Sequence, residues 1–275
     1  MTYCVGVRNQ HGLVFLADSR TNAGLDQIST FRKLHLFEIA GERVIVLLTA
    51  GNLAISQSIA SHLRVMMNNP DEKSLATVPN MFSAAKLVGD TVRKVYARDA
   101  EGLKEFGIEF NVNLILGGQI KGEAPRLFNV YSAGNFIEAT SETPYFQIGE
   151  SKYGKPILDR VLNYSTPLNL ATKCALISMD STLKSNISVG LPLDLLVYEK
   201  DSLKADKLVT IDESNPYFQL IHELWGEKLR EAFNSIAEPN WSGSKKSSAI
   251  SSPAKKMGVI SINRELRKTV PPKRK

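Results

Sequence analysis

The order in which strands and helices are predicted constrains the fold of this 275-residue chain more than any other feature. Alternating apolar residues predict strands, and apolar residues spaced by three or four predict helices. The order is strands, two helices, strands, two helices, strands and one more helix. Because strands are grouped apart from helix pairs, the order disfavours a parallel α/β fold. We predict an α+β fold, a four-layer αββα sandwich of two antiparallel sheets flanked by helices.

The predicted elements are separated by turn and helix-stop signals. Asn9-Gln10-His11-Gly12 predicts a hairpin that opens the chain, and Ala40-Gly41-Glu42 predicts a second hairpin. The strands are predicted at residues 3–7, 13–17, 34–37, 43–50, 112–116, 126–131, 136–139, 193–198 and 207–211. The helices are predicted at about residues 55–66, 81–95, 155–163, 168–185 and 217–229.

Charge is distributed unevenly along the chain. Ten of the 34 Lys and Arg residues, but only one of the 28 Asp and Glu residues, lie between Ser242 and Lys275. That segment therefore carries +9, and residues 1–241 carry −3. Its Ser, Lys and Pro content buries too little apolar surface to offset the entropy of ordering. We predict a folded domain over residues 1–241 and a basic tail over residues 242–275, which contacts solvent or an acidic partner.

Composition excludes several classes of protein. The two cysteines and four histidines show no spacing of a metal site or disulfide framework. The longest strongly apolar run, Val44 to Leu48, is too short to span a membrane, and charged residues interrupt any signal peptide. The basic clusters of the tail lack interleaved aromatic residues. We expect a cytoplasmic protein that neither enters a membrane nor recognises a specific nucleic acid.

Thr2 is the first candidate for catalysis. Because a small side chain follows the initiator methionine, removal of Met1 is expected, and it would leave Thr2 with a hydroxyl and a free α-amino group. Such an amine has a pKa of about 7.7–8.0 and is a recognised base for activating a threonine hydroxyl. Thr2 is therefore a candidate nucleophile that carries its own base. A Met-Thr start is also common in proteins of other functions.

Three further residues are predicted to lie near Thr2. Asp18 ends the second strand, which a tight hairpin brings back beside the start of the first. Lys33 begins the third strand, where its ammonium would favour the deprotonated Thr2 oxygen if a carboxylate such as Asp18 fixed its position. Gly51 ends the fourth strand, where an unhindered N–H is able to bind an oxyanion. A surface ion pair and a simple turn glycine are the alternatives.

Other polar residues are weaker candidates. Cys4 would become an N-terminal nucleophile only if the three preceding residues were removed. His35 falls on the same strand face as Lys33 and is a candidate for lining the site. Asp180-Ser181-Thr182 is predicted to lie on the exposed face of a helix, and His222 to have a structural role in another helix.

Longer motifs resemble a known family. The pattern of Thr2, Asp18, Lys33 and Gly51 resembles the β subunits of proteasomes, which are N-terminal nucleophile (Ntn) hydrolases. Three segments are similar to Anbu, a group of bacterial proteasome-related peptidases: SRTNAG and ISTFRK within 19–33, IGESKYGKPILDR at 148–160 and SNISVGLP at 185–192. The resemblance runs from Thr2 to about Trp241 and leaves the basic tail outside.

The resemblance implies an αββα sandwich, an N-terminal threonine peptidase and assembly with copies of itself in a ring or spiral. Thr2 matches the nucleophile, Asp18 and Lys33 the activating pair, and Gly51 the oxyanion donor. Ser188 matches a serine that helps to hold the N-terminal amine.

Two positions depart from the proteasome pattern, and the Anbu-like motifs share both exchanges. Glu150 stands where β subunits have a serine, and Ser185 stands where they have an aspartate. If the Glu150 carboxylate hydrogen-bonds the Thr2 ammonium, it raises the pKa of the amine, which is then a weaker base at neutral pH. Glu150 is therefore included among the catalytic candidates, with Arg20 and Ser185 as supporting residues.

The sequence thus predicts a self-assembling threonine endopeptidase that cleaves peptide or amide bonds and needs no metal or organic cofactor. No P-loop is recognisable, so ATP-driven unfolding of a protein substrate would require a separate ATPase. Three alternatives stay open. They are an Ntn amidohydrolase acting on a small amide, an assembly or binding subunit whose site has lapsed, and a protein that binds an anionic partner through its tail.

Overall fold

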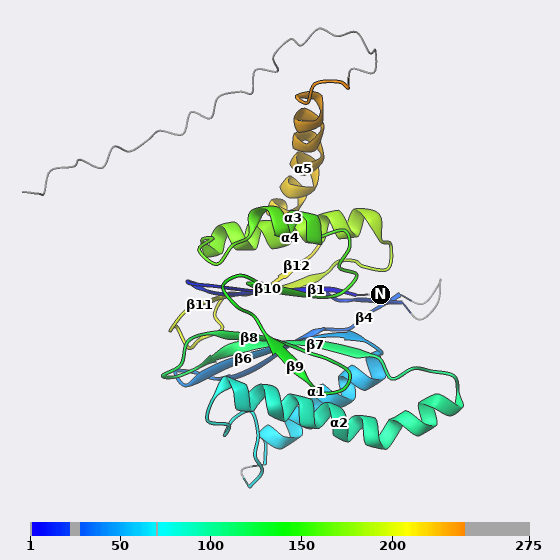
Figure 1. Cartoon of the computed structure of the whole chain (residues 1–275), viewed down its shortest axis with the longest axis vertical. Coiled ribbons are helices and arrows are strands. Elements are labelled where there is room, and N and C mark those ends of the chain that lie inside the picture. Colours follow the sequence, from blue (N-terminus) through cyan, green and yellow to red (C-terminus); the bar gives the residue numbers. More distant parts are fainter. Residues whose placement is uncertain (1, 23–27, 70, 240–275) are drawn as a thin grey trace, which may run out of the picture. The chain divides into compact units, whose positions relative to one another are not determined.

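The computed structural model describes residues 2–22, 28–69 and 71–239, and the fold is that of the compact unit that ends at Phe233 (Figure 1). The predicted basic tail, residues 242–275, lies outside the described residues, as does part of the SRTNAG motif. The domain boundary at residue 241 therefore stays a prediction.

Two five-stranded antiparallel sheets form the centre of the unit. In spatial order, the first contains β10 (Tyr145–Gly149), β1 (Tyr3–Asn9), β2 (Gly12–Asp18), β11 (Leu193–Glu199) and β12 (Leu208–Ile211). The second contains β5 (Leu34–Ile39), β6 (Arg43–Gly51), β7 (Val112–Ile120), β8 (Arg126–Val130) and β9 (Phe136–Glu138). A separate two-stranded ribbon joins β3 (Arg20–Asn22) to β4 (Ile28–Thr30).

Helices cover the outer face of each sheet, so the unit has four layers (Figure 1). The second sheet is covered by α1 (Leu53–Met67) and α2 (Met81–Glu105), and the first by α3 (Lys155–Val161) and α4 (Leu168–Ser185). The last helix, α5 (Pro216–Asn234), adds buried residues to the core of the first sheet. The predicted αββα sandwich is confirmed. Within the described residues, none of the helices is both long and apolar enough to cross a membrane.

The central strands are apolar on both faces because each sheet is covered twice. In β2, Phe15 points toward the second sheet, whereas its neighbours Val14 and Leu16 point toward the helices. Side chains of successive strand residues point to opposite faces, so a buried strand needs an unbroken apolar run. Burial of one such side chain contributes about 2 kcal/mol.

Most element boundaries agree with the sequence predictions, with three differences. Strand β10 and the short ribbon of β3 and β4 were not predicted, and α2 continues about ten residues beyond the predicted end, to Glu105. Strand β10 is an edge strand that pairs only with β1, and its five residues show a weak pattern. Its absence from the prediction matters, because it contributes Gly149 and leads directly to Glu150.

His35 is buried away from Thr2, and it is not among the residues that line the cavity at Thr2 described below. Its Nδ1 atom lies 3.1 Å from a guanidinium nitrogen of Arg64 in α1. Because a guanidinium only donates, Nδ1 accepts this bond and the ring is neutral. Burial lowers the pKa of His35 from 6.5 to about 4, and the Arg64 charge acts in the same direction.

The buried His35 makes stability depend on pH. The folded chain keeps His35 neutral down to about pH 4, whereas the unfolded chain protonates it below about pH 6.5. Stability from this residue is therefore complete above pH 6.5 and is lost as the pH falls toward 4. His35→Gln retains an acceptor for Arg64 but does not titrate. As the pH falls from 6.5 to 4, we expect its free energy of unfolding, measured in urea, to decrease by about 3 kcal/mol less than that of the parent. Parallel pH profiles for the two proteins would contradict this assignment.

Candidate active site

The pairing of β1 with β2 and β10 positions Thr2. Tyr3 pairs with Gly149 of β10, and the N–H of Glu150 donates a hydrogen bond of 2.7 Å to the Thr2 carbonyl oxygen. Gly149 has a left-handed φ of +80°, and a Cβ at this position would overlap the Thr2 backbone. Only glycine allows this close approach at low cost. The backbone of Thr2 is thus tied to the end of β10.

Asp18 and Lys33 form a buried ion pair behind Thr2, as predicted for residues at two strand ends. The Lys33 Nζ atom lies 2.8 Å from Asp18 Oδ1, and the two side chains are 5% and 0% exposed. Asp18 Oδ1 also accepts a hydrogen bond from the Tyr3 N–H at 3.0 Å. Lys33 Nζ donates a second bond of 2.6 Å to the Arg20 carbonyl oxygen. The surface ion pair, which was the alternative, is excluded.

Burial raises the pKa of Asp18, and the nearby Lys33 charge and its hydrogen bond oppose this shift. The Tyr3 N–H acts in the same direction as Lys33. A carboxylate that is fully buried stays charged only while such partners compensate for the loss of water. The Lys33 ammonium is therefore a necessary part of the environment of Asp18.

Gly51 presents its N–H on the Lys33 side of β6. The Thr49 N–H donates to the Lys33 carbonyl oxygen at 3.0 Å, and the Asn52 N–H donates to Asn111 on the opposite side at 2.8 Å. Because successive N–H groups of a strand point to opposite neighbours, the Gly51 N–H points to the same side as that of Thr49. Strand β5 begins only at Leu34 and does not extend to this position.

A cavity of about 740 Å³ connects these residues. Among the predicted residues, Thr2, Lys33, Gly51 and Glu150 line it, while Asp18 lies buried beneath. The sequence analysis did not identify the other residues of its wall, which are Thr21, Thr49, Ala50, Asn52, Leu53, Ser56, Asn111 and Gly149. Several are polar, but nothing in their local sequence pattern sets them apart from ordinary strand-end and cap residues.

The Glu150 side chain is held by a residue to which the sequence analysis gave no role. Asn186 Nδ2 donates a hydrogen bond of 3.2 Å to Glu150 Oε2. Asn186 Oδ1 accepts from the Ser188 N–H at 2.9 Å. Asn186 and Ser188 lie in the loop after α4, so this loop contacts the end of β10. An Asn directly after a helix is typical of a residue that ends the helix, so the sequence pattern gives no sign of its second contact, with Glu150.

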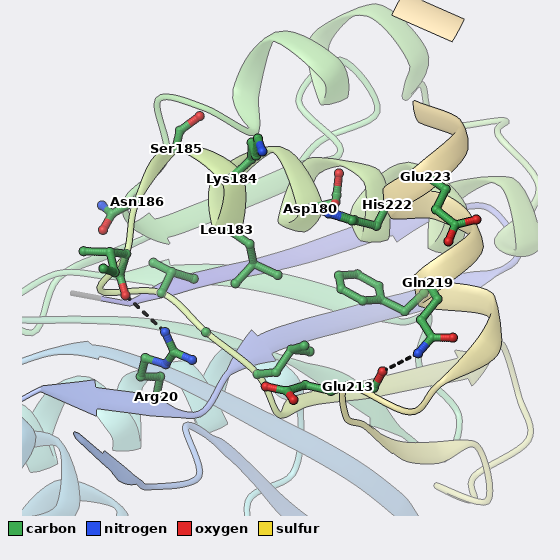
Figure 2. Close-up of a pocket in the computed structure, with 15 residues that line it drawn as sticks. Arg20, Asp180, Leu183, Lys184, Ser185, Asn186, Glu213, Gln219, His222 and Glu223 are labelled. Carbon is green, nitrogen blue, oxygen red and sulfur yellow. Dashed lines mark hydrogen bonds and ion pairs between the residues drawn. The ribbon is translucent and has the colours of Figure 1, made fainter. Parts of the chain in front are cut away.

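The remaining predicted residues are not part of the cavity wall at Thr2. Ser188 is half-buried and is not part of the cavity wall at Thr2. Ser185 is exposed and lines a second cavity of about 970 Å³ between α4 and α5. Arg20 connects the two regions, because its carbonyl oxygen binds Lys33 while its guanidinium lines the second cavity and donates to the Ile187 oxygen (Figure 2).

Two further expectations are settled by burial. Cys4 is completely buried, and burial raises the pKa of its thiol, so the thiol is inaccessible as a nucleophile in this fold. Asp180 and Thr182 are also buried, so the prediction that they lie on an exposed helix face was wrong. Asp180 faces α5, where its Oδ1 atom lies 2.7 Å from Nδ1 of His222 (Figure 2). No group of three or more potential ligands that could hold a metal ion occurs among the described residues.

An αββα sandwich with a threonine directly before β1, near a buried Lys–Asp pair, defines the Ntn-hydrolase fold of the proteasome type. Comparison with known proteins specifies the family. The proteasome subunit family model matches residues 2–190. The chain therefore belongs to the proteasome subunit family, and within it is an Anbu-type, proteasome-related protein.

Three solved structures illustrate this similarity. Anbu from Yersinia bercovieri is 56% identical, with a TM-score of 0.82, and the match covers 87% of this chain and 99% of that chain. An Anbu Gly-1 mutant from Hyphomicrobium sp. strain MC1 is 49% identical, with a TM-score of 0.81 and coverage of 87% and 100%. A helical assembly of the Anbu complex from Pseudomonas aeruginosa is 47% identical, with a TM-score of 0.84 and coverage of 88% and 100%. No curated protein matches the chain.

The buried ion pair gives a test of the site's architecture. Asp18→Asn leaves the Lys33 ammonium buried without an opposite charge, so we expect the free energy of unfolding to fall by about 3 kcal/mol in urea titrations. Asp18→Asn combined with Lys33→Met removes both charges and is expected to recover most of that loss. A single variant within about 0.5 kcal/mol of the parent, or a double variant no more stable than the single one, would contradict the pair's role.

Proposed function

We propose that the protein is a threonine peptidase of the proteasome type that cleaves peptide or amide bonds after Met1 is removed. The observation that carries the proposal is the common cavity of Thr2, Lys33, Gly51 and Glu150, with Asp18 paired to Lys33 beneath it. A nucleophile, a positive charge and a backbone donor thus face one space that can hold a substrate.

In the proposed mechanism, the Thr2 Oγ atom attacks the substrate carbonyl carbon and the Thr2 amine takes the hydroxyl proton. Lys33, oriented by Asp18 and the Arg20 carbonyl oxygen, stabilises negative charge on Oγ. The Gly51 N–H binds the oxyanion of the tetrahedral intermediate. The protonated amine then gives its proton to the leaving amine, and an ester joins Thr2 to the acyl group. Water, activated by the same amine, hydrolyses this ester.

An electrophile selective for N-terminal threonine tests this mechanism. We expect intact-mass analysis to find loss of Met1 and one adduct per chain, formed on Thr2. Thr2→Ser keeps a hydroxyl and an N-terminal amine and is the matched control that should still react, whereas Thr2→Ala should form no adduct. Active protein that retains Met1, or an equal adduct on Thr2→Ala, would refute the mechanism.

Substrates distinguish the alternatives. Cleavage of denatured protein or peptides supports a peptidase, whereas hydrolysis of small amides alone supports an Ntn amidohydrolase. A Thr2 that reacts with neither electrophile nor substrate supports a lapsed assembly subunit. The bond between Glu150 and Asn186 favours a maintained site, because it holds a carboxylate at the cavity.

We also propose that the chain assembles with copies of itself, as the helical Anbu complex from Pseudomonas aeruginosa does. The apolar face of α5 supports this. Ile221 is buried in the core, and Trp225, Leu229 and Phe233 continue the same face at intervals of four residues. Leu229 is 49% exposed and Phe233 is 76% exposed, so the face continues beyond the surface that the described residues cover. A second copy of the chain is the partner that this face fits. We propose as well that the protein is located in the cytoplasm and that a separate ATPase would unfold any protein substrate.

Charged substitutions on α5 test the assembly. We expect Leu229→Glu combined with Phe233→Glu to shift the mass in analytical ultracentrifugation from a multimer to smaller species, because burying two carboxylates in an apolar contact is unfavourable. Val65→Glu, at a 67% exposed position in α1, is the control and should leave the mass unchanged. A multimer that persists in the α5 variant would exclude this face as the contact.

A further inference from the structure

Asn186 lies where the loop after α4 contacts the end of β10. Its backbone N–H donates to the Thr182 carbonyl oxygen at 2.9 Å, and its side chain turns inward, so that the residue is only 8% exposed. A buried side-chain amide needs partners for its polar atoms, because leaving one of them unpaired costs about 1–3 kcal/mol. Asn186 has two such partners, on opposite sides of its amide group.

These partners fix the orientation of the amide. The Ser188 N–H, which only donates, lies 2.9 Å from Oδ1, and the Glu150 carboxylate, which accepts when ionised, lies 3.2 Å from Nδ2. The amide satisfies both partners in one orientation and neither in the flipped one. Asn186 therefore presents a donor to Glu150 and cannot exchange it for an acceptor without losing the turn to Ser188.

Glu150 is held at both of its ends as a result. Its backbone N–H is bonded to the Thr2 carbonyl oxygen, and its carboxylate is bonded to Asn186. A half-buried glutamate has several side-chain torsions, and without a fixed partner it would spend much of its time in solvent. The bond to Asn186 removes that freedom on the side of the cavity that contains Thr2.

We propose that Asn186 is a positioning residue that holds the Glu150 carboxylate at the amino end of Thr2. The inference rests on the proposed function, because it requires the free Thr2 amine that Met1 removal creates. Among the described residues, the charged groups around that amine are Glu150 from the end of β10, Lys33 before β5 and Asp18 from the end of β2. Asp18 and Lys33 neutralise each other, so Glu150 supplies the net charge of this group.

The test measures the Thr2 amine directly. The full-length chain is produced with Thr2 as its first residue, by cleavage of a removable fusion. Acetylation of the α-amine by acetic anhydride is then followed by mass spectrometry over a range of pH. A carboxylate held near an ammonium raises its pKa, so we expect Glu150→Gln to lower the apparent pKa of the amine by about one unit. Asn186→Ser should lower it by about half a unit, since the freed carboxylate then spends only part of its time nearby.

The choice of serine separates positioning from folding. A serine hydroxyl at residue 186 still accepts the Ser188 N–H in the same kind of turn, but it is too short to reach Glu150. Asn163→Ser is the matched control, because Asn163 accepts the Ser165 N–H at 3.0 Å in a similar turn and is not part of the cavity wall at Thr2. Asn163→Ser should leave the apparent pKa of the Thr2 amine unchanged.

The double variant gives the decisive result. If Asn186 acts through Glu150, Glu150→Gln combined with Asn186→Ser shifts the amine no further than Glu150→Gln alone. An unshifted Asn186→Ser, or a double variant whose shift is the sum of the two, overturns the proposal. The pKa of the amine is measured without any substrate. If the expected shifts are found but Thr2 does not react with the electrophile, the positioning role of Asn186 is retained and the peptidase is refuted.

Discussion

The contact on which the rest of the site depends is the buried ion pair of Asp18 and Lys33. Removing two charges from water is costly, and their mutual attraction offsets this only when further hydrogen bonds complete the geometry. Here the Tyr3 N–H donates a second hydrogen bond to Asp18 Oδ1, and the Arg20 carbonyl oxygen accepts a second one from Lys33. The pair thereby joins the start of β1, the end of β2 and the segment before β5 at one point. Because Tyr3 is bonded to this network, the network also fixes the position of Thr2, which directly precedes Tyr3.

Residues at the ends of continuous apolar runs were predictable from the sequence, and residues joined by long-range pairing were not. Asp18 and Gly51 end strands that are apolar on both faces, so their positions followed from where those runs stop. Lys33 was placed by the same reasoning at a strand start. Glu150 entered only through resemblance, because the five-residue edge strand before it shows little local pattern. His35 shows the limit of strand alternation: the pattern predicts that it shares a face with Lys33, yet His35 packs toward Arg64 in α1 while Lys33 binds Asp18 of the other sheet.

Asn186 illustrates a second limit. Local rules identify an asparagine after a helix as an end residue, and that role is real, since its N–H binds Thr182. Its contact with Glu150, 36 positions away, depends on how the loop after α4 meets the edge of the first sheet. Neither hydrophobic periodicity nor residue propensity predicts this contact between the loop and the sheet edge. The αββα architecture could therefore be predicted, while the wall of the cavity required the assembled fold.

The two departures from the proteasome pattern have a common geometric consequence. Ser185 is exposed and lines the second cavity, and it carries no charge. The carboxylate that lines the cavity at Thr2 comes instead from Glu150, directly after the end of β10. A charge supplied from the end of β10 is tied to the Thr2 backbone by the hydrogen bond that the Glu150 N–H donates to the Thr2 carbonyl oxygen. In the proposed mechanism, the effect of this carboxylate on the amine depends on the side-chain conformation of Glu150, which the hydrogen bond from Asn186 restrains. In the proposed positioning role, Asn186, an uncharged residue, sets the strength of the base through Glu150.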